Sequence, residues 1–398
     1  MQGFFLATIL VFCVATSNLV IADGRRNFNA AEFGAIGDGQ TDNSEAFLKA
    51  WEAVCTATVR GTATLEIPAG TFLLNPVKFE GPCKSNKVHL QVLGKIVAPR
   101  TIDEWRPRCK SSVWLLFRGI SGLIVNGPGA IDGRGSNWWK LGQTHGCKRP
   151  RALQFHNCNH VKLSGLTHMN SPKVHIGVNG CKGVSISNLN ISAPEDSPNT
   201  DGIGISGSTD VHISNSTIGT GDDCIAVNGG CSHINITNVT CGPGHGISVG
   251  SLGDKGCNDK VEDVHVQNCT FIGTQNGVRI KTWPGGSGYA KNISFERIVL
   301  HQTKNPIIID QHYCNGHKCT EKAVAVELSG IKYSGVEGTS ASKQAITFDC
   351  AKIGCRNIAM DQINITSSSP GKQIHAFCNN AKGTSTSTTP LVPCLLSL

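Results

Sequence analysis

The sequence is poor in the residues that build helical cores and membrane spans. Aromatic side chains make up 6% of its 398 residues and there are only three methionines, whereas glycine occurs 46 times. This composition favours many short strands and turns over a helical bundle. Beyond the first 22 residues, no stretch approaches the ~20 consecutive apolar residues that a membrane span needs. We therefore expect no membrane association of the mature chain, which is long enough for two average domains or one repetitive one.

Charged side chains are absent from residues 1–22, which hold an apolar run and end in small residues. This pattern is typical of a secretory signal peptide. A membrane anchor is the alternative, but the apolar core is short and no basic cluster follows it until Arg25 and Arg26. We expect residues 1–22 to be removed and residues 23–398 to form a secreted, extracellular protein.

No two cysteines have the C-x-x-C spacing of a zinc site, although the chain contains 18 cysteines. In an exported protein, so many cysteines indicate disulfides. Removal of Cys13 with the signal peptide leaves 17, an odd number, so at least one thiol must stay free. The close pairs Cys350/Cys355 and Cys314/Cys319 are candidate disulfides, while the connectivity as a whole stays open.

Seven N-x-S/T sequences also fit an exported protein, and we expect some but not all of them to carry glycans. Their asparagines are Asn190, Asn215, Asn235, Asn238, Asn268, Asn292 and Asn364. The net charge is +8, and the signal peptide contributes none of it. A basic, exported protein is a poor nucleic-acid binder by context, so an acidic polysaccharide is the better partner.

Two sets of short strand patterns alternate along the central region, each with apolar residues at every second position. The first set leads with Val161, Val184, Val211, Ile234, Val264 and Ile293, and the second with Ile176, Ile203, Ile225, Ile247, Val278 and Ile307. Two or more strands per ~25-residue unit, with Gly and Asn turns, predict an all-β, right-handed parallel β-helix. A Greek-key sandwich is the alternative, but it would not keep this register over so many turns.

The stack of coils is expected to run from about residue 60 to 370 as one domain, because no linker-like composition divides the chain. The ends of such a stack need covers. Residues 41–55 have apolar side chains at a helical period after a Thr/Asp cap, which predicts a helix that plugs the first end. The last ~20 residues, held by Cys378 and Cys394, are expected to close the other end.

Asp201, Asp223 and His245 each lie two positions before a leading apolar residue, spaced 22 and 22 residues apart. Equal positions on successive coils stack ~4.8 Å apart, so these side chains are predicted to form a column. Stacked carboxylates repel one another, and a purely structural sequence would more often place Asn, Ser or Thr there. The alternative is that both aspartate stretches are ordinary turns, but the whole column favours a functional site.

The surface beside this column is predicted to be open and bordered by cations. Arg279 and Lys281 occupy outward positions of one coil, where the preceding coils place mostly small residues. Arginine can bind a carboxylate through two parallel hydrogen bonds, and lysine adds a point charge. The alternative is a solvated strand face, but acids on one side and cations on the other indicate a cleft for an anionic sugar.

Grouped aspartates suit glycosidic hydrolysis, in which one carboxylic acid protonates the leaving oxygen and another carboxylate activates water or attacks carbon. Asp223 shares the column with Asp201, so these two are predicted to hold one water between them. Asp222 points to the opposite face and is the predicted proton donor. We expect the neighbouring carboxylates to raise the pKa of Asp222 and so to keep it protonated.

Four stretches resemble, in order, the signature motifs of polygalacturonases, glycoside hydrolase family 28. They are SPNTDGI, GTGDDCIAV, GPGHGISVGSLG and VRIKTW. FGAIGDGQTDNSEAF and GPGAIDGRGSNWW are similar to the N-terminal parts of that family, so the resemblance covers essentially the whole mature chain. The sequence looks most like plant polygalacturonases, and among them the exo-acting pollen type, with endo action as the alternative.

This resemblance implies an inverting hydrolase of the α-1,4 bonds of polygalacturonic acid, the pectin of the plant cell wall. It implies Asp222 as the general acid and Asp201 and Asp223 as the residues that activate water. His245 is implied to support the protonation of the acid. Because inversion needs room for a water, the acid and base carboxyl groups should lie ~6.5–9.5 Å apart.

The same resemblance assigns substrate contacts and a disulfide. The matched substrate-binding positions are Asn199, Arg279, Lys281 and Tyr313. Arg279 and Lys281 are implied to bind the substrate carboxylate, and Cys224 and Cys241 match a pair that is usually bridged near the site. No cofactor and no metal is required, and we expect a monomer.

Two other functions suit the same fold. A pectate lyase is also built on a β-helix, but it would need a Ca²⁺-binding acidic cluster and a basic residue as proton abstractor. A β-helix that only binds pectin, or serves as a wall adhesin, is the other alternative. The intact Asp201, Asp222 and Asp223 argue against it.

Overall fold

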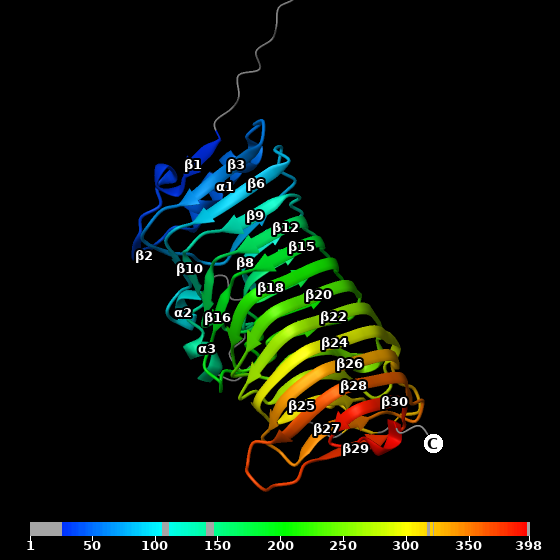
Figure 1. Ribbon diagram of the computed structural model, residues 1–398. Coiled ribbons are helices and arrows are strands. Elements are labelled where there is room, and N and C mark those ends of the chain that lie inside the picture. Colours follow the sequence, from blue (N-terminus) through cyan, green and yellow to red (C-terminus); the bar gives the residue numbers. More distant parts are fainter. Residues whose placement is uncertain (1–25, 106–110, 141–146, 317–318, 321, 396–398) are drawn as a thin grey trace, which may run out of the picture.

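The structure is a computed structural model, and it describes residues 26–105, 111–140, 147–316, 319–320 and 322–395. Two parallel sheets wind into an elongated β-helix (Figure 1), as the repeats predicted. The predicted signal peptide, residues 1–22, lies outside the described residues. Within the described ranges, no helix has both the length and the apolar character needed to cross a membrane.

One sheet contains eleven strands, and each pairs in parallel with the strand of the next coil. In stacking order these are β5 (Val77–Glu80), β8 (Val113–Arg118), β11 (Arg151–His156), β14 (Ile176–Asn179), β17 (Ile203–Ser206), β19 (Ile225–Val227), β21 (Ile247–Leu252), β23 (Asn276–Thr282), β25 (Asn305–Asp310), β27 (Gln344–Asp349) and β29 (His375–Asn379). We call it the eleven-stranded sheet.

The nineteen-stranded sheet forms the rest of the wall. Its members are β1 (Asn27–Asn29), β2 (Asp38–Asp42), β3 (Thr62–Ile67), β4 (Thr71–Leu73), β6 (Lys87–Val92), β7 (Lys95–Val97), β9 (Leu123–Asn126), β10 (Ala130–Asp132), β12 (Asn159–Ser164), β13 (Thr167–Met169), β15 (Lys182–Ser187), β16 (Asn190–Ser192), β18 (Thr209–Gly219), β20 (Cys231–Cys241), β22 (Asn258–Ile272), β24 (Ser287–Thr303), β26 (Glu327–Ser340), β28 (Cys355–Ser367) and β30 (Ala381–Thr389). From β18 onward, one long strand takes the place of two short ones, since β15 and β16 both pair with it.

The predicted register is confirmed along both columns of leading apolar residues. The first column pairs Val161, Val184, Val211, Ile234, Val264 and Ile293 in succession. The second pairs Ile176, Ile203, Ile225, Ile247, Val278 and Ile307. All of these side chains are buried. Because alternate strand residues point to opposite faces, they line one continuous core between the two sheets.

Bends within the nineteen-stranded sheet recur at one register position, where the backbone is left-handed. Asn215, Asn238 and Asn268 occupy this position on successive coils, with φ of 51°, 55° and 53°. Asparagine tolerates this conformation better than most residues. Asn238 Nδ2 donates to Asn215 Oδ1 (3.1 Å), and Arg297 Nε donates to Asn268 Oδ1 (2.6 Å). Three of the glycosylation sequences therefore belong to this stacked column.

The first end of the stack is covered by helix α1 (Ser44–Thr56), close to the predicted 41–55. Its buried Trp51 donates from Nε1 to the carbonyl oxygen of Glu80 (3.0 Å), and the Cys55–Cys83 disulfide ties its last turn to the chain after β5. A short 3-10 helix, η1 (Ala30–Phe33), packs beside it. Strands β1 and β2 precede α1, so the stack begins earlier than residue 60.

The other end is closed by the last described residues, as predicted. The Cys378–Cys394 disulfide joins β29 to the 3-10 helix η5 (Pro393–Leu395), and Val392 and Leu395 are fully buried. The stack reaches Thr389 in β30, beyond the predicted limit near 370.

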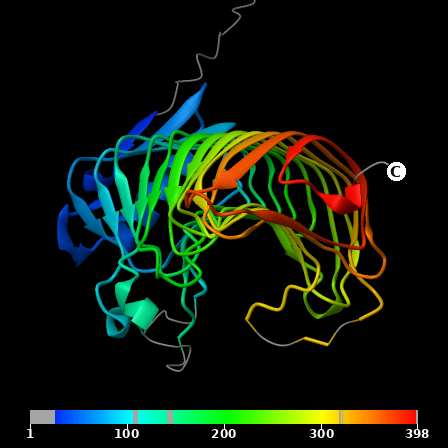
Figure 2. The ribbon, with the colours of Figure 1, turned by 60° about the horizontal axis from the view of Figure 1, so that its bottom comes forward.

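Two short helices were not predicted. α2 (Ile102–Trp105) and α3 (Ser136–Lys140) project together from one side of the molecule, while the segment that follows β25 projects on the other side of the same face (Figure 2). Trp105 and Trp138 pack edge to face at 5.6 Å between ring centroids. A third 3-10 helix, η4 (Asp254–Gly256), follows β21.

The structure confirms both candidate disulfides and the pair that the resemblance implied. Among the described residues the bonds are Cys55–Cys83, Cys224–Cys241, Cys314–Cys319, Cys350–Cys355 and Cys378–Cys394. The free thiols in this part of the chain are Cys158, Cys181, Cys231, Cys257 and Cys269, more than the single one that the odd count required. Cys257 alone of these is exposed.

Candidate active site

The predicted catalytic residues meet just before three successive strands of the eleven-stranded sheet. Asp201 lies two residues before β17, and Asp223 lies two residues before β19, with Asp222 directly before it in the chain. His245 lies two residues before β21. Because these strands pair in register, residues that are about 22 positions apart in the chain share one site.

Thr200 and Gly221 hold the two aspartate loops together. Gly221 N donates to Thr200 Oγ1 (3.0 Å), and the same hydroxyl shares a hydrogen bond with Ser197 Oγ (2.7 Å). Position 221 must be glycine, because an added Cβ would lie 2.1 Å from the carbonyl oxygen of Ser197. The Cys224–Cys241 disulfide anchors the chain directly after the paired aspartates, as the resemblance implied.

Asp223 is a buried carboxylate with both oxygens occupied. Arg279 Nη2 lies 2.6 Å from Oδ1 and Lys281 Nζ lies 2.7 Å from Oδ2. Ser248 Oγ donates to Oδ1 (3.0 Å) and accepts from Arg279 Nε (2.9 Å). A buried charge needs such pairing. Asp223 therefore organises the two cations that were predicted to bind substrate.

Asp222 faces His245 and Asn199 rather than the cations. His245 Nδ1 lies 3.1 Å from Asp222 Oδ1, the same oxygen accepts from Asp223 N (2.8 Å), and Asn199 Nδ2 donates to Oδ2 (3.3 Å). Burial raises the pKa of Asp222. The hydrogen bond from His245, with the positive charges of His245 and Lys281, outweighs burial and lowers this pKa to about 2.

The pKa of Asp201 is shifted in the opposite direction to that of Asp222. Burial, followed by the charges of Asp222 and Asp223, raises the pKa of Asp201 well above its ordinary value, and Lys281 offsets only part of this. The pKa shifts of Asp201 and Asp222 are therefore opposite in direction in the free protein. The expectation that the pKa of Asp222 is raised is wrong, because the hydrogen bond from His245 and the nearby positive charges lower it despite burial.

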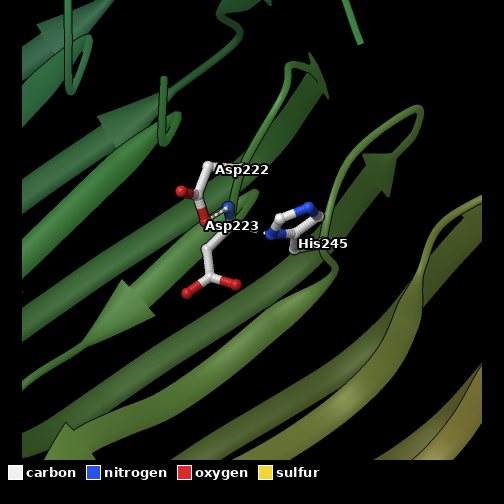
Figure 3. Close-up of side chains that lie close together, drawn as sticks. All are labelled: Asp222, Asp223 and His245. Carbon is white, nitrogen blue, oxygen red and sulfur yellow. Dashed lines mark hydrogen bonds and ion pairs between the residues drawn. The ribbon is translucent and has the colours of Figure 1, made fainter. Parts of the chain in front are cut away.

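The predicted column is correct for the backbone and wrong for one side chain. Asp201, Asp223 and His245 hold equal register positions. However, His245 N donates to Asp222 O (2.8 Å), and its ring contacts Asp222 instead of continuing the column (Figure 3). The strand pattern placed the residue correctly and did not give the direction of its ring.

The adjacent aspartates bring one oxygen each close together. An oxygen of Asp222 and an oxygen of Asp223 lie within 4.8 Å of each other; the ~6.5–9.5 Å separation of acid and base carboxyl groups stays a prediction. The hydrogen bond from Asp223 N to Asp222 Oδ1 holds the two carboxyl groups near each other, although they point to different sides (Figure 3).

A cleft of about 270 Å³ opens in front of these residues. Its lining includes Asn199, Lys281 and Tyr313 in addition to the aspartates, as the sequence predicted. The Tyr313 ring lies 5.2 Å from Lys281 Nζ and packs edge to face on Trp283 at 5.3 Å. Tyr313 thus holds the ammonium group beside the acids through a cation–π contact.

Three cations near the cleft were missed in the sequence. Arg149 Nη2 donates to Asn199 Oδ1, and Arg151 and Lys173 line the cleft on the coils that precede Asp201. The basic run from residue 148 to 151, directly before a strand, was the available signal. The position equal to that of Asp201, counted back by two coils along the paired strands, is Arg151.

Two groups of carboxylates and imidazole lie close enough to share a cation. They are Asp222, Asp223 and His245, and Asp310, His312 and Asp349. In the first group both Asp223 oxygens already face Arg279 and Lys281. In the second, His312 Nδ1 lies 3.2 Å from Asp349 Oδ2. The absence of a metal requirement stays a prediction.

All seven predicted glycosylation asparagines lie in the nineteen-stranded sheet, away from the cleft residues of the other sheet. Asn235 is half-buried, whereas the other six are exposed.

Comparison with known proteins gives the family. The profile of glycosyl hydrolases family 28 matches residues 55–388. A probable polygalacturonase of Arabidopsis thaliana is 49% identical over 374 residues, which cover 92% of this chain and 80% of that protein. A polygalacturonase of Persea americana is 42% identical over 356 residues, covering 88% and 76%.

A solved structure has the same fold. The endo-xylogalacturonan hydrolase of Aspergillus tubingensis superposes with a TM-score of 0.78 and 28% identity over 89% of this chain and 97% of that one. Its similarity spans the β-helix, and the family profile spans both aspartate stretches. The chain belongs to glycosyl hydrolases family 28.

Proposed function

We propose that the protein is a secreted polygalacturonase, an inverting hydrolase of the α-1,4-galacturonosyl bonds of polygalacturonic acid in the plant cell wall. The observation that carries the proposal is the meeting of Asp201, Asp222, Asp223 and His245 on successive coils, in a cleft with cations on both sides. The names of the plant relatives support the same substrate. Secretion is supported by the disulfides.

Asp222 donates the proton to the leaving oxygen, and Asp201 and Asp223 hold the attacking water. Glycosidic cleavage needs these two roles on opposite sides of the sugar. Asp222 faces the open side with Asn199, whereas Asp223 points into the cation pair. His245 Nδ1, at 3.1 Å from Asp222 Oδ1, is the group through which Asp222 regains its proton.

The lowered pKa of Asp222 in the free protein disfavours its protonated form, so the proposed acid has to gain a proton when substrate is bound. A sugar that fills the cleft excludes water and disfavours a second negative charge. Burial and the charges of Asp222 and Asp223 raise the pKa of Asp201, which favours its protonated form. A protonated His245 passes its proton to Asp222 across the 3.1 Å contact between Nδ1 and Oδ1 and becomes neutral, and Asp201 orients the water once its own carboxyl is ionised.

Arg279 and Lys281 bind the carboxylate of a galacturonosyl unit with the donors that Asp223 leaves unused. Guanidinium has five N–H donors and ammonium three, whereas the contacts to Asp223 and Ser248 engage only a few of them. Asn199 and Tyr313 complete the contacts to the same region of the substrate.

Exo action, the mode of the pollen type, is the finer proposal. A cleft of about 270 Å³ holds a short stretch of chain, and α2 and α3 project on one side of the molecule while the segment after β25 projects on the other (Figure 2). A chain end fits such a bounded site more readily than the middle of a polymer. Release of galacturonate monomer alone in the first minutes supports exo action, whereas a ladder of oligomers contradicts it and indicates endo action.

The reaction class is tested on polygalacturonate by reducing-sugar release, ultraviolet absorbance and the anomeric form of the new end, read by proton NMR. Hydrolysis with inversion gives reducing sugar, no new absorbance and a β-anomer. A rise in absorbance without the corresponding gain in reducing sugar indicates a lyase. Binding without any product indicates a wall adhesin, and an initial α-anomer overturns inversion.

A further inference from the structure

A second group of cations lies on the side of the acids opposite Arg279 and Lys281. Residues Leu153, Ile176, Ile203 and Ile225 pair on successive coils. Counting back from them, Arg151 occupies the register position of Asp201 and Asp223, and Lys173 occupies that of Asp222. Successive coils lie ~4.8 Å apart. Arg151 therefore lies two coils before Asp201 in its column, with Val174 between them. Lys173 lies two coils before Asp222, with Thr200 between them.

The half-buried ammonium group of Lys173 has no anion or hydrogen-bond acceptor in contact with it in the described part of the chain. Its side chain is half-buried in the cleft lining, and within the described ranges it makes no hydrogen bond and no ion pair. By contrast, Arg149 donates to Asn199, and Arg151 Nη1 lies 3.5 Å from Gln154 Oε1, at the limit of a hydrogen bond. An unpaired ammonium withdrawn from water costs free energy unless an anion joins it.

The charges of the three cations act on one another. Burial, then the charges of Arg151 and Arg149, lowers the pKa of Lys173, and Asp201 and Asp222 act in the opposite direction. Burial also lowers the pKa of Arg149. Cations that crowd together around a cleft are expected where a bound anion relieves their repulsion.

We propose that Arg149, Arg151 and Lys173 form a second carboxylate-binding site, which holds an unesterified galacturonosyl unit on the side of the acids away from Arg279 and Lys281. The inference rests on the proposed polygalacturonase function. It makes Lys173 a residue that determines specificity, because a methyl ester removes the charge with which its ammonium pairs. Free carboxylates are then required on both sides of the bond that is cleaved.

Lys173→Gln tests this site, because glutamine keeps polarity and removes the charge. KM on polygalacturonate is expected to rise about tenfold, whereas kcat should change less than about threefold. The reason is that the lost charge-assisted contact is made in both the ground state and the transition state. The preference in kcat/KM for polygalacturonate over half-methyl-esterified pectin is expected to fall by about the same factor. Lys173→Arg should restore most of that preference.

Lys162→Gln is the matched control. Lys162 is an exposed lysine on β12 of the nineteen-stranded sheet, outside the cleft lining, and its substitution should leave both substrates unaffected. A Lys173→Gln enzyme with wild-type preference overturns the inference, even if its KM has changed, since a structural defect alters both substrates alike.

A binding measurement distinguishes failure of this inference from failure of the proposed function. If the wild type hydrolyses neither substrate, binding of trigalacturonate and of its methyl ester is measured by calorimetry on the same proteins. Weaker binding of trigalacturonate by Lys173→Gln, with unchanged binding of the ester, supports the carboxylate site without catalysis. Equal binding of trigalacturonate by both proteins contradicts it.

Discussion

Two carboxyl groups of this site, Asp201 and Asp222, have pKa values that are shifted in opposite directions. Asp222 contacts His245 and has a pKa lowered to about 2, whereas burial beside two carboxylates raises the pKa of Asp201. Separated pKa values among grouped acids give one site an acid and a base, but in the free protein the raised pKa is on Asp201 and not on the proposed acid Asp222. Replacement of each residue by its amide should therefore change the stability of the protein in opposite directions.

Asp222→Asn is expected to reduce kcat by about 10²–10⁴-fold, because it removes the proton donor. It should also destabilise the protein by about 2 kcal/mol at pH 7, since a folded pKa near 2 against ~3.9 in the unfolded chain favours folding by that order. This stability is present above pH ~3.9 and is lost as pH falls towards 2. Unchanged hydrolysis rates would show that Asp222 is not the acid.

Asp201→Asn is expected to abolish most activity and yet raise the melting temperature by about 2–4 °C near pH 7. Because the folded pKa of Asp201 is raised, its ionisation opposes folding as pH rises through that pKa. Below the unfolded pKa of ~3.9 the carboxyl is protonated in both states, so the gain should vanish there. Thermal unfolding at pH 3.5 and 7 measures this, and a lower melting temperature at pH 7 contradicts it.

At the scale of elements, strand order and register could be predicted because they depend on a repeated pattern. Val and Ile at every second position specify which face is buried, and successive coils must then align. The direction of the His245 ring depends on a local backbone hydrogen bond to Asp222, which no repeat encodes. α2 and α3 were missed because each is a single short turn outside the repeat.

The Cys224–Cys241 disulfide should matter for both stability and catalysis, since it anchors the loop of paired aspartates. Its closed loop spans 17 residues, for which chain entropy predicts about 3 kcal/mol. Cys224→Ala/Cys241→Ala is therefore expected to lower the unfolding free energy by about that amount and to reduce kcat. The matched control removes Cys350–Cys355, which lies outside the cleft lining and should leave kcat unchanged.

The stacked asparagines restrict glycosylation. Asn215 and Asn238 are joined side chain to side chain on neighbouring coils, only ~4.8 Å apart, so two glycans would collide there. We expect at most one of this pair to be occupied on any molecule and half-buried Asn235 to be bare. Glycopeptide mass spectrometry of the secreted protein measures occupancy, and peptides with glycans on both Asn215 and Asn238 would contradict this expectation.

The whole molecule is a stack in which each coil contacts mainly its neighbours, so its stability depends on its ends. The eleven-stranded and nineteen-stranded sheets both terminate in strands whose backbone groups would otherwise face solvent or another chain. α1 covers the first end and the Cys378–Cys394 segment the other. The catalytic coils lie several coils from either cover. Stability and chemistry should therefore be separable by substitution at an end.

Trp51→Ala tests this separation. Trp51 is 4% exposed, packs on Phe79 and Phe117 with ring centroids 5.4 and 5.8 Å away, and bonds Glu80 O. Loss of such a side chain should cost about 3–5 kcal/mol of unfolding free energy, measured by urea denaturation.

Leu48→Ala on the same helix is the control, because Leu48 is 38% exposed and its loss should cost about 0.5 kcal/mol or less. Since α1 touches no cleft residue in the described lining, kcat of the folded Trp51→Ala protein should match the wild type well below its melting temperature. Equal losses of stability in the two variants would show that α1 does not hold the end of the stack, and a reduced kcat with full folding would show that the end and the active site are coupled.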